Sequence, residues 1–246
     1  MIAVIGLAVT VGRSIAPSTV SAEPLITLVP TSTTTTTKPQ PKPQVPVITN
    51  LASPAGQIPI YDKPGGQQIG TTGFYYGYPV SLPILQSTND GWVRVRLPVR
   101  PNGSTAWVHR NQVAISNTPY RVVVHRGQTS VTVYKSGFPI FTIPAGLGKS
   151  STPTPLGNFF VAVIEQPGPA GYGPIVFDTS AHSEAIQSWE GAGDAVIAMH
   201  GPISASSDKQ IGSSGTYISN GCIRLHVSDQ QRLSVIPIGT PVDILP

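Results

Sequence analysis

The chain has 246 residues, and its 26 prolines and 25 glycines make up about a fifth of them. Charged residues account for only 11% of the chain and hydrophobic residues for 39%. This composition excludes a coiled coil, a helical bundle and a highly charged disordered chain, because glycine and proline are unfavourable inside helices. The net charge of +4, without a cluster of lysines, arginines and aromatic residues, does not indicate a nucleic-acid-binding protein. We therefore expect a mainly β fold.

The first residues form an apolar segment typical of exported proteins. Residues 2–11 (IAVIGLAVTV) carry no charge and are too few for a transmembrane helix, which needs about 20 residues. They suit the hydrophobic region of a signal peptide, and Val20-Ser21-Ala22 resembles its cleavage site. No lysine or arginine precedes the run, so a buried strand and a start further upstream are alternatives. Residues 1–22 are predicted to be a signal peptide or a membrane-proximal apolar segment.

A linker is predicted at residues 23–49. Its central part, PTSTTTTTKPQPKPQVPV, is rich in threonine and proline and contains no aromatic residue. Such a segment buries too little apolar surface to offset the entropy of ordering its backbone. Its prolines favour an extended spacer, either a tether across a thick envelope or a passive connection.

Residues 50–117 are predicted to form a small β-rich region. Strand-like segments alternate with the turns KPGG, NDG and RPNGS, and no helical periodicity is present. Five strands in about 60 residues is the size of a small, partly open barrel. The strand-like segments are QIPIYD (57–62), YPVSLPIL (78–85), WVRVRLP (92–98) and AWVHRNQVAI (106–115).

A second β-rich region is predicted at residues 118–246, with one or two short helices. One helix is expected from Ser183, as a cap with Glu184 in its first turn, and another from Ser228, whose spacing to Gln231 suits a capping box. The Ser- and Gly-rich stretch at residues 204–215 is expected to be a mobile loop. The strand-like segments are RVVVH (121–125), SVTVYK (130–135), FPIFTIPAG (138–146), NFFVAVIE (158–165), AVIAMHG (195–201) and GTPVDIL (239–245).

Cys222 is the only cysteine, which excludes a disulfide within the chain and a four-cysteine zinc site. In an exported protein a single cysteine indicates intermolecular pairing or a reactive thiol. Cys222 follows the polar turn Ser219-Asn220-Gly221, which favours an exposed sulfur over a structural role in an apolar core. A thiol attacks as its thiolate and therefore needs a base or a cation nearby.

Five histidines are candidates for that base. His200 ends a strand-like run and precedes Gly201, so its imidazole is expected at a strand end. His226 shares a strand face with Cys222 but would lie about 13 Å away along an extended chain. His182 is a second candidate for the pocket. The remaining two are His125, in an alternating strand, and His109, in the first β-rich region.

Residues 120–246 resemble the catalytic domain of bacterial L,D-transpeptidases, envelope enzymes that cross-link peptidoglycan stem peptides. The family signature is His-Gly, a variable stretch, and Ser-His-Gly-Cys followed by Ile/Val-Arg-Leu/Met. Here it reads His200-Gly201 and Ser219-Asn220-Gly221-Cys222-Ile223-Arg224-Leu225. Upstream, residues 152–159 (TPTPLGNF) match the family's Thr-Pro-x-Gly-x-Phe turn. The resemblance implies a transpeptidase-type β-sandwich.

The region at residues 50–117 resembles bacterial SH3-like domains of cell-envelope proteins. The matching features are IPIYDKPGG, the Gly91-Trp92-Val93 strand start and Trp107-Val108 in the last strand. The resemblance implies a module that binds the wall, with a glycan contact, or that serves as a spacer. Trp92 and Trp107 are expected in its core.

The transpeptidase resemblance implies acyl transfer without a cofactor or a metal. His200 takes the proton of Cys222 or stabilises its thiolate, which attacks a stem tetrapeptide at the bond to the terminal D-Ala. An amine of a second stem resolves the thioester and gives a 3→3 cross-link, whereas water would give L,D-carboxypeptidase activity. It further implies localisation in the cell envelope, inhibition by carbapenem β-lactams and, as we expect, a monomer.

The remaining roles are expected from the same motifs. The backbone around Asn220, Gly221 and Cys222 is expected to stabilise the oxyanion, and Ser219 to orient His200. Arg224 is expected to bind a stem carboxylate or, alternatively, to pair with an acidic neighbour. Tyr172 and Trp189 are expected either to line the cleft or to pack. The other expected substrate-binding residues are Gly201, Tyr217, His182 and Ser183.

The sequence departs from the family pattern at three places. Asn220 stands in place of the usual second histidine, Pro202 stands where threonine is frequent, and the interval between His200 and Ser219 is longer than usual. These departures keep a second hypothesis open, a non-catalytic wall-binding protein with a decayed catalytic domain.

Two other classes remain as alternatives. A sortase-like or papain-like cysteine enzyme would require Thr-Leu-x-Thr before the cysteine, or a cysteine that precedes its histidine, and the chain has neither feature around Cys222 and His200. A zinc site would use His182, His200, Cys222 and His226, but no paired short ligand spacing supports it.

Overall fold

The structure is a computed structural model that describes residues 42–213 and 216–246, which belong to one compact unit. The predicted signal peptide at residues 1–22 and most of the predicted linker at residues 23–49 lie outside the described residues. None of the helices in the described part of the chain is long and apolar enough to span a membrane.

The N-terminal part of the described chain is an antiparallel sheet of seven strands. A hairpin of β4 (Phe74–Tyr75) and β5 (Tyr78–Pro79) lies between β3 and β6 in the chain, and the 3-10 turn η1 (Arg110–Gln112) precedes β9. In spatial order the strands are β3 (Gln68–Thr72), β2 (Ile58–Tyr61), β8 (Thr105–His109), β7 (Trp92–Arg96), β6 (Leu82–Ser87), β1 (Thr49–Pro54) and β9 (Val113–Thr118).

The four segments predicted within residues 57–115 contain strands, and the last of them is divided by η1 into β8 and β9. β1, β3 and β4 are additional, so the seven-stranded sheet exceeds the five strands expected. β3 (QIGTT) has a single large apolar residue, Ile69, so its pairing with β2 depends on backbone hydrogen bonds that no hydrophobic pattern signals. Trp92 and Trp107 are buried, as expected. The SH3-like assignment of this sheet stays a prediction.

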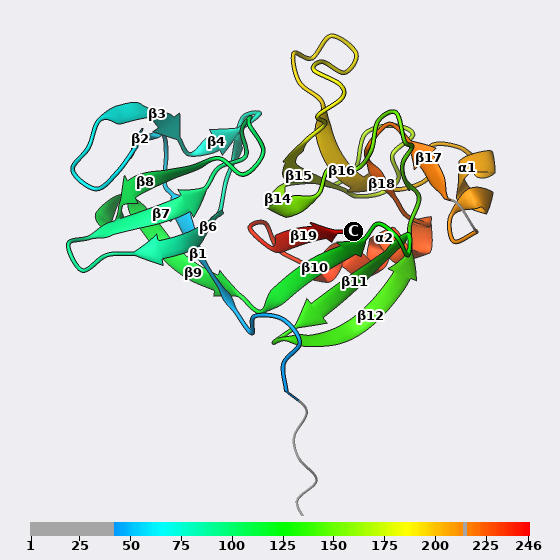
Figure 1. Cartoon of the computed structure of the whole chain (residues 1–246), viewed down its shortest axis with the longest axis horizontal. Helices are drawn as coiled ribbons and strands as arrows, with labels where there is room; N and C mark the ends of the chain where they lie inside the picture. Colours follow the sequence, from blue (N-terminus) through cyan, green and yellow to red (C-terminus); the bar gives the residue numbers. More distant parts are fainter. Residues whose placement is uncertain (1–41, 214–215) are drawn as a thin grey trace, which may run out of the picture. The chain divides into compact units, whose positions relative to one another are not determined.

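The C-terminal part contains a mixed sheet of eight strands, in which β10 pairs with β19, and β16 with β18, in parallel (Figure 1). A two-stranded sheet joins β13 (Leu147–Gly148) and β17 (Tyr217–Ser219). In spatial order the strands are β12 (Phe138–Pro144), β11 (Ser130–Lys135), β10 (Tyr120–His125), β19 (Pro241–Leu245), β14 (Gly157–Glu165), β15 (Val176–His182), β16 (Val196–His200) and β18 (Ile223–Arg224).

The predicted mainly β fold is confirmed, and so are the predicted strands of this part. β15 (VFDTSAH) is an additional strand, because polar residues interrupt its apolar pattern. The helix predicted from Ser228 exists as α2 (Val227–Arg232), followed by the 3-10 turn η2 (Leu233–Val235). The predicted cap is wrong, because His226 is the N-cap residue and makes no side-chain capping bond.

Two predictions for the connecting segments are wrong. The segment from Ser183 to Asp194 is not helical, because Arg100 binds the carbonyl oxygens of Ser183 and Ile186, which would accept intrahelical hydrogen bonds in a helix. Residues 204–213 are not an irregular loop throughout but begin with α1 (Ala205–Gln210). The hydroxyl of Ser204 accepts a hydrogen bond from the backbone N–H of Ser207 and so caps α1.

Strand β14 connects the two hydrophobic cores. Its side chains alternate between two faces, so Phe159 and Val161 pack in the core of the C-terminal part, whereas Phe160 and Ala162 pack in the core of the N-terminal sheet. A strand buried on both faces must be apolar at successive positions, which accounts for the continuous run FFVAV.

Candidate active site

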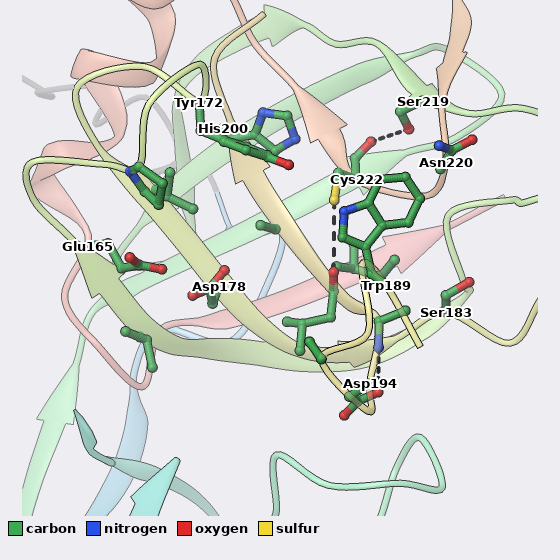
Figure 2. A pocket seen from close by; sticks show the side chains of 18 of the residues that line it. Glu165, Tyr172, Asp178, Ser183, Trp189, Asp194, His200, Ser219, Asn220 and Cys222 are labelled. Carbon is green, nitrogen blue, oxygen red and sulfur yellow. Dashed lines mark hydrogen bonds between the residues drawn. The ribbon is translucent and has the colours of Figure 1, made fainter. Parts of the chain in front are cut away.

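Strand pairing brings His200 and Cys222 to the same pocket. β16 ends at His200 and pairs in parallel with β18, in the register Met199 with Ile223 and His200 with Arg224. Cys222 immediately precedes β18. Both side chains line a pocket of about 620 Å³. Figure 2 shows the imidazole and the sulfur on the same side of this pocket.

The His200 side chain has the tautomer that a general base requires. Its Nδ1 lies 2.7 Å from the carbonyl oxygen of Gly201. Because a carbonyl oxygen only accepts, Nδ1 carries the proton and Nε2 keeps its lone pair. Burial, aided by the positive charge of Arg224, lowers the pKa of His200 to about 4, so the imidazole is neutral at pH 7. The edge-on ring of Tyr172, with its centroid 4.7 Å away, fixes the imidazole plane.

Cys222 is a neutral thiol in this environment. Burial raises the pKa of its thiol above the ordinary value, and the charge of Asp178 acts in the same direction. Its sulfur lies 3.9 Å from the carbonyl oxygen of Val196, which can accept the thiol proton in a weak hydrogen bond. The resting pair is therefore a thiol and a neutral imidazole, and the proton must leave the sulfur during attack.

Buried hydrogen bonds fix the turn that carries Cys222. The Ser219 hydroxyl donates to the carbonyl of Cys222 at 2.6 Å and accepts from the N–H of Gly221 at 3.1 Å. Thr154, which is fully buried, donates to the carbonyl of Gly221 at 2.7 Å. Gly221 has a φ of 128°, and a Cβ there would lie 2.8 Å from Ile197. Only glycine therefore fits this turn.

The geometry bears on two expected roles. The hydrogen bonds of Ser219 are to its own turn, whereas the Nδ1 of His200 bonds to Gly201, so the orienting role of Ser219 stays a prediction. The N–H of Gly221 is engaged by Ser219, and Asn220 lines the pocket next to Cys222. The oxyanion role of this turn also stays a prediction.

Three of the expected substrate-binding residues lie at the pocket. Arg224 lines it, and no carboxylate of the described residues is within 4.0 Å of its guanidinium, so the alternative salt bridge is not present among them. Ser183 also lines the pocket. Gly201 is buried beside it, and its N–H donates to the carbonyl of Tyr172 at 2.8 Å.

The other two expected residues lie apart from the lining. Tyr217 is exposed, and its hydroxyl donates to the carbonyl of Arg126 at 2.9 Å. His182 is buried, with Nδ1 2.8 Å from a carboxylate oxygen of Asp194, which itself lines the pocket. Tyr172 and Trp189 line the pocket, which is one of the two positions expected for them.

The sequence did not predict a pair of carboxyl groups in the pocket. Glu165, at the end of β14, and Asp178, in β15, both line the pocket and lie close together (Figure 2). Burial, together with the hydrogen bond and negative charge of Glu165, raises the pKa of Asp178 to about 7. The proximity of two carboxyl groups is a signal that appears only once β14 and β15 are paired.

Lining residues also come from the N-terminal part of the described chain. Tyr76 and Tyr78, at the β4–β5 hairpin, line the same pocket as Cys222. No sequence motif indicated them.

No group of three or more metal-ligating side chains occurs within residues 42–213 and 216–246. The candidates for a zinc site are separated, because the Nδ1 of His226 pairs with Asp208 at 2.7 Å, whereas His182 pairs with Asp194.

Comparison with known sequences identifies similar proteins. The profile of the L,D-transpeptidase catalytic domain (YkuD) matches residues 119–244. YkuD of Bacillus licheniformis, which carries the name of an L,D-transpeptidase, is 33% identical over 130 residues, or 52% of this chain and 67% of that protein. YkuD of Bacillus subtilis is 30% identical over 128 residues, or 51% of this chain and 66% of that protein.

Solved structures with a similar fold include an L,D-transpeptidase from Mycobacterium smegmatis. It is 18% identical, with a TM-score of 0.41, over 67% of this chain and 82% of that chain. Another is L,D-transpeptidase 3 from Mycobacterium tuberculosis in complex with a faropenem-derived adduct. It is 18% identical, with a TM-score of 0.39, over 58% of this chain and 67% of that chain.

Proposed function

Because the chain belongs to the family of L,D-transpeptidase catalytic domains, we propose that it is a peptidoglycan L,D-transpeptidase with Cys222 as nucleophile and His200 as general base. The substrate is a stem tetrapeptide, attacked at the bond to its terminal D-Ala. The observation that carries the proposal is the joint placement of the Cys222 thiol and the His200 imidazole, whose Nδ1 bonds to the carbonyl of Gly201, in one pocket. The raised pKa of the thiol and the lowered pKa of the imidazole agree with a neutral resting pair.

The acylation step follows from these protonation states. The Nε2 of His200 accepts the thiol proton while the sulfur of Cys222 bonds to the carbonyl carbon. The tetrahedral oxyanion forms beside the turn of Asn220 to Cys222, where backbone N–H groups stabilise it. When the intermediate collapses, the C–N bond breaks, His200 returns the proton to the amine of D-Ala, and a thioester remains.

The second half-reaction restores the thiol. An amine of a second stem attacks the thioester, the C–S bond breaks, and the sulfur of Cys222 regains a proton through His200. The product is a 3→3 cross-link. Water in place of the amine gives L,D-carboxypeptidase activity as a side reaction.

The unpaired guanidinium of Arg224, among the described residues, supports recognition of an anionic group of the stem. A guanidinium binds a carboxylate through two parallel hydrogen bonds, which fixes the orientation of the peptide. Ser183, Gly201 and Asn220 complete the proposed peptide contacts. Asn220 replaces the family histidine, and its side chain supplies an amide where an imidazole is usual.

The wider organisation is part of the same proposal. Residues 1–22 direct export, residues 23–49 form a linker in the envelope, residues 50–117 form an SH3-like domain, and residues 118–246 form the catalytic domain. The family's substrate lies in the cell wall, which supports an extracytoplasmic location. The proposed enzyme acts as a monomer and needs no cofactor.

The test is the intact mass of the protein after incubation with a carbapenem. We expect a stoichiometric adduct in the wild type and none in Cys222→Ala. His200→Ala should form the adduct about 100-fold more slowly, because a general base is lost. His226→Ala, which alters a histidine paired with Asp208, is the matched control and should react like the wild type.

A negative result discriminates between the hypotheses. If a small alkylating reagent labels Cys222 but the carbapenem adds no mass, the pocket lacks an activated nucleophile. The chain would then be a wall-binding protein with a decayed catalytic domain. A positive result leads to assays with tetrapeptide donors, with amine and water as acceptors.

A further inference from the structure

The pocket extends onto the β4–β5 hairpin of the N-terminal part, outside residues 119–244. Two exposed tyrosines at the β4–β5 hairpin, Tyr76 at 57% and Tyr78 at 46% exposure, line it together with Cys222. Phe74, in the same hairpin and 52% exposed, is outside the lining among the described residues. The hairpin thus presents two of its three exposed aromatic rings to the pocket.

Polar contacts hold the N-terminal sheet at this position. The guanidinium of Arg100 donates to Asp194 at 2.8 Å and to the carbonyl oxygens of Ser183 at 2.8 Å and Ile186 at 3.0 Å. The Asn102 side chain forms two hydrogen bonds with the backbone of His182, at 2.8 and 2.9 Å. These five hydrogen bonds join the N-terminal part to the C-terminal part. They therefore hold the hairpin with the two tyrosines in place beside the pocket.

The tyrosines lie at the end of the pocket that is remote from the reacting atoms. The Tyr76 hydroxyl is 3.4 Å from a carboxylate oxygen of Asp194. Figure 2 shows Asp194 and His200 at opposite ends of the labelled residues, with Trp189 and Cys222 between them. A ligand group on Tyr76 is therefore well separated from a carbonyl at Cys222.

This end of the pocket is aromatic, and its nearest carboxylate is neutralised. The carboxylate of Asp194 is balanced by Arg100 at 2.8 Å, and His182 lies 2.8 Å from its other oxygen. The hydrogen bonds of Arg100 and Ala195 hold the pKa of Asp194 below its usual range, so this balance holds at neutral pH. Phenol rings offer apolar faces with a hydroxyl at the edge, a surface suited to an uncharged, hydroxylated ligand.

We propose that Tyr76 and Tyr78 form a subsite for the sugar that carries the donor stem peptide. The assignment rests on the proposed function, in which the attacked carbonyl belongs to the third stem residue. Three extended residues span about 10 Å, which places the sugar away from Cys222 and on the remote side of the pocket. The N-terminal sheet thereby selects donors that are still attached to glycan.

Binding to a chain that lacks the nucleophile tests the subsite without turnover. In a Cys222→Ala background, titration calorimetry gives the Kd of a free tetrapeptide and of the same tetrapeptide attached to its disaccharide. We expect the disaccharide form to bind more tightly. When Tyr76→Ala and Tyr78→Ala are both added to this background, the Kd of the disaccharide form should rise about tenfold. The Kd of the free tetrapeptide should stay unchanged.

Two further variants make the outcome specific. Tyr78→Ala alone leaves the Tyr76–Asp194 hydrogen bond in place and should weaken disaccharide binding in the same direction. Phe74→Ala, in the same hairpin, should change neither Kd. The proposal would be overturned if both ligands had equal Kd values, or if the tyrosine variants lost affinity equally for both ligands. Either result leaves the carbapenem test of Cys222 unaffected, so the two proposals can fail separately.

Discussion

At the residue scale, the Cys222 sulfur sits where burial disfavours the thiolate that attack requires. Its pKa is raised, and the pKa of His200 is lowered to about 4. Both shifts oppose a resting thiolate–imidazolium pair, because each penalises the charged form. The resting thiol and imidazole are therefore neutral, and they become charged only when the sulfur attacks a carbonyl carbon.

The reactivity of Cys222 toward a small alkylating reagent is expected to depend steeply on pH. Only the thiolate reacts, and below the thiol pKa its fraction rises tenfold per pH unit. The rate constant for iodoacetamide should thus rise about tenfold per unit between about pH 6 and pH 8. Mass spectrometry follows the label, with Cys222→Ala as the blank. A rate independent of pH in this range would indicate a preformed ion pair and contradict the assigned states.

The residues of the site differ in how far sequence could predict them. Cys222 and His200 stand in short motifs whose residue types carry the chemistry, so the sequence alone identified them. Asp178 and Tyr76 lack such a motif. Asp178 lies in β15, which pairs with β14, and Tyr76 reaches the pocket from the turn of the β4–β5 hairpin, where its hydroxyl contacts Asp194 far along the chain. Thr154 was part of a matched motif, but its hydrogen bond to Gly221 is visible only after folding.

At the element scale, the segment from Ser183 to Asp194 shows why a helix predicted from local propensity does not form. Its sequence suits a helix start, yet Arg100 binds the carbonyl oxygens of Ser183 and Ile186 from outside the segment. In a helix those carbonyls would accept intrahelical bonds instead. Tertiary contacts therefore override propensity here, and they place Trp189 at the pocket.

Arg100 is expected to act as a positioning residue for this segment. Arg100→Ala leaves two carbonyls and Asp194 without their donor, so the segment should loosen and carbapenem acylation should slow about tenfold. Limited proteolysis should cut the variant between residues 183 and 195 faster than the wild type. Arg110→Ala, at an exposed arginine in the 3-10 turn η1 of the same N-terminal part, is the control. Unchanged cleavage together with unchanged acylation would show that the segment holds its shape without Arg100.

At the scale of the whole molecule, β14 makes the two sheets dependent on each other. Phe160 is fully buried among side chains of the N-terminal sheet, while its neighbours Phe159 and Val161 complete the core of the C-terminal part. Neither sheet can lose its structure without exposing one face of this strand. The described residues accordingly form one compact unit, and we expect them to unfold together.

Equilibrium unfolding in denaturant tests this coupling. In a Trp189→Phe background, which removes the tryptophan of the C-terminal part, Trp92 and Trp107 report on the N-terminal sheet. Far-UV circular dichroism reports on all strands, so the two signals should give one coincident transition. Phe160→Ala should lower the free energy of unfolding by about 3–5 kcal/mol, the usual cost of emptying a buried phenylalanine site. Phe74→Ala, at an exposed ring, should change it by less than about 0.5 kcal/mol. Fluorescence and dichroism transitions at different denaturant concentrations would mean that the sheets unfold independently, and that β14 belongs energetically to only one of them.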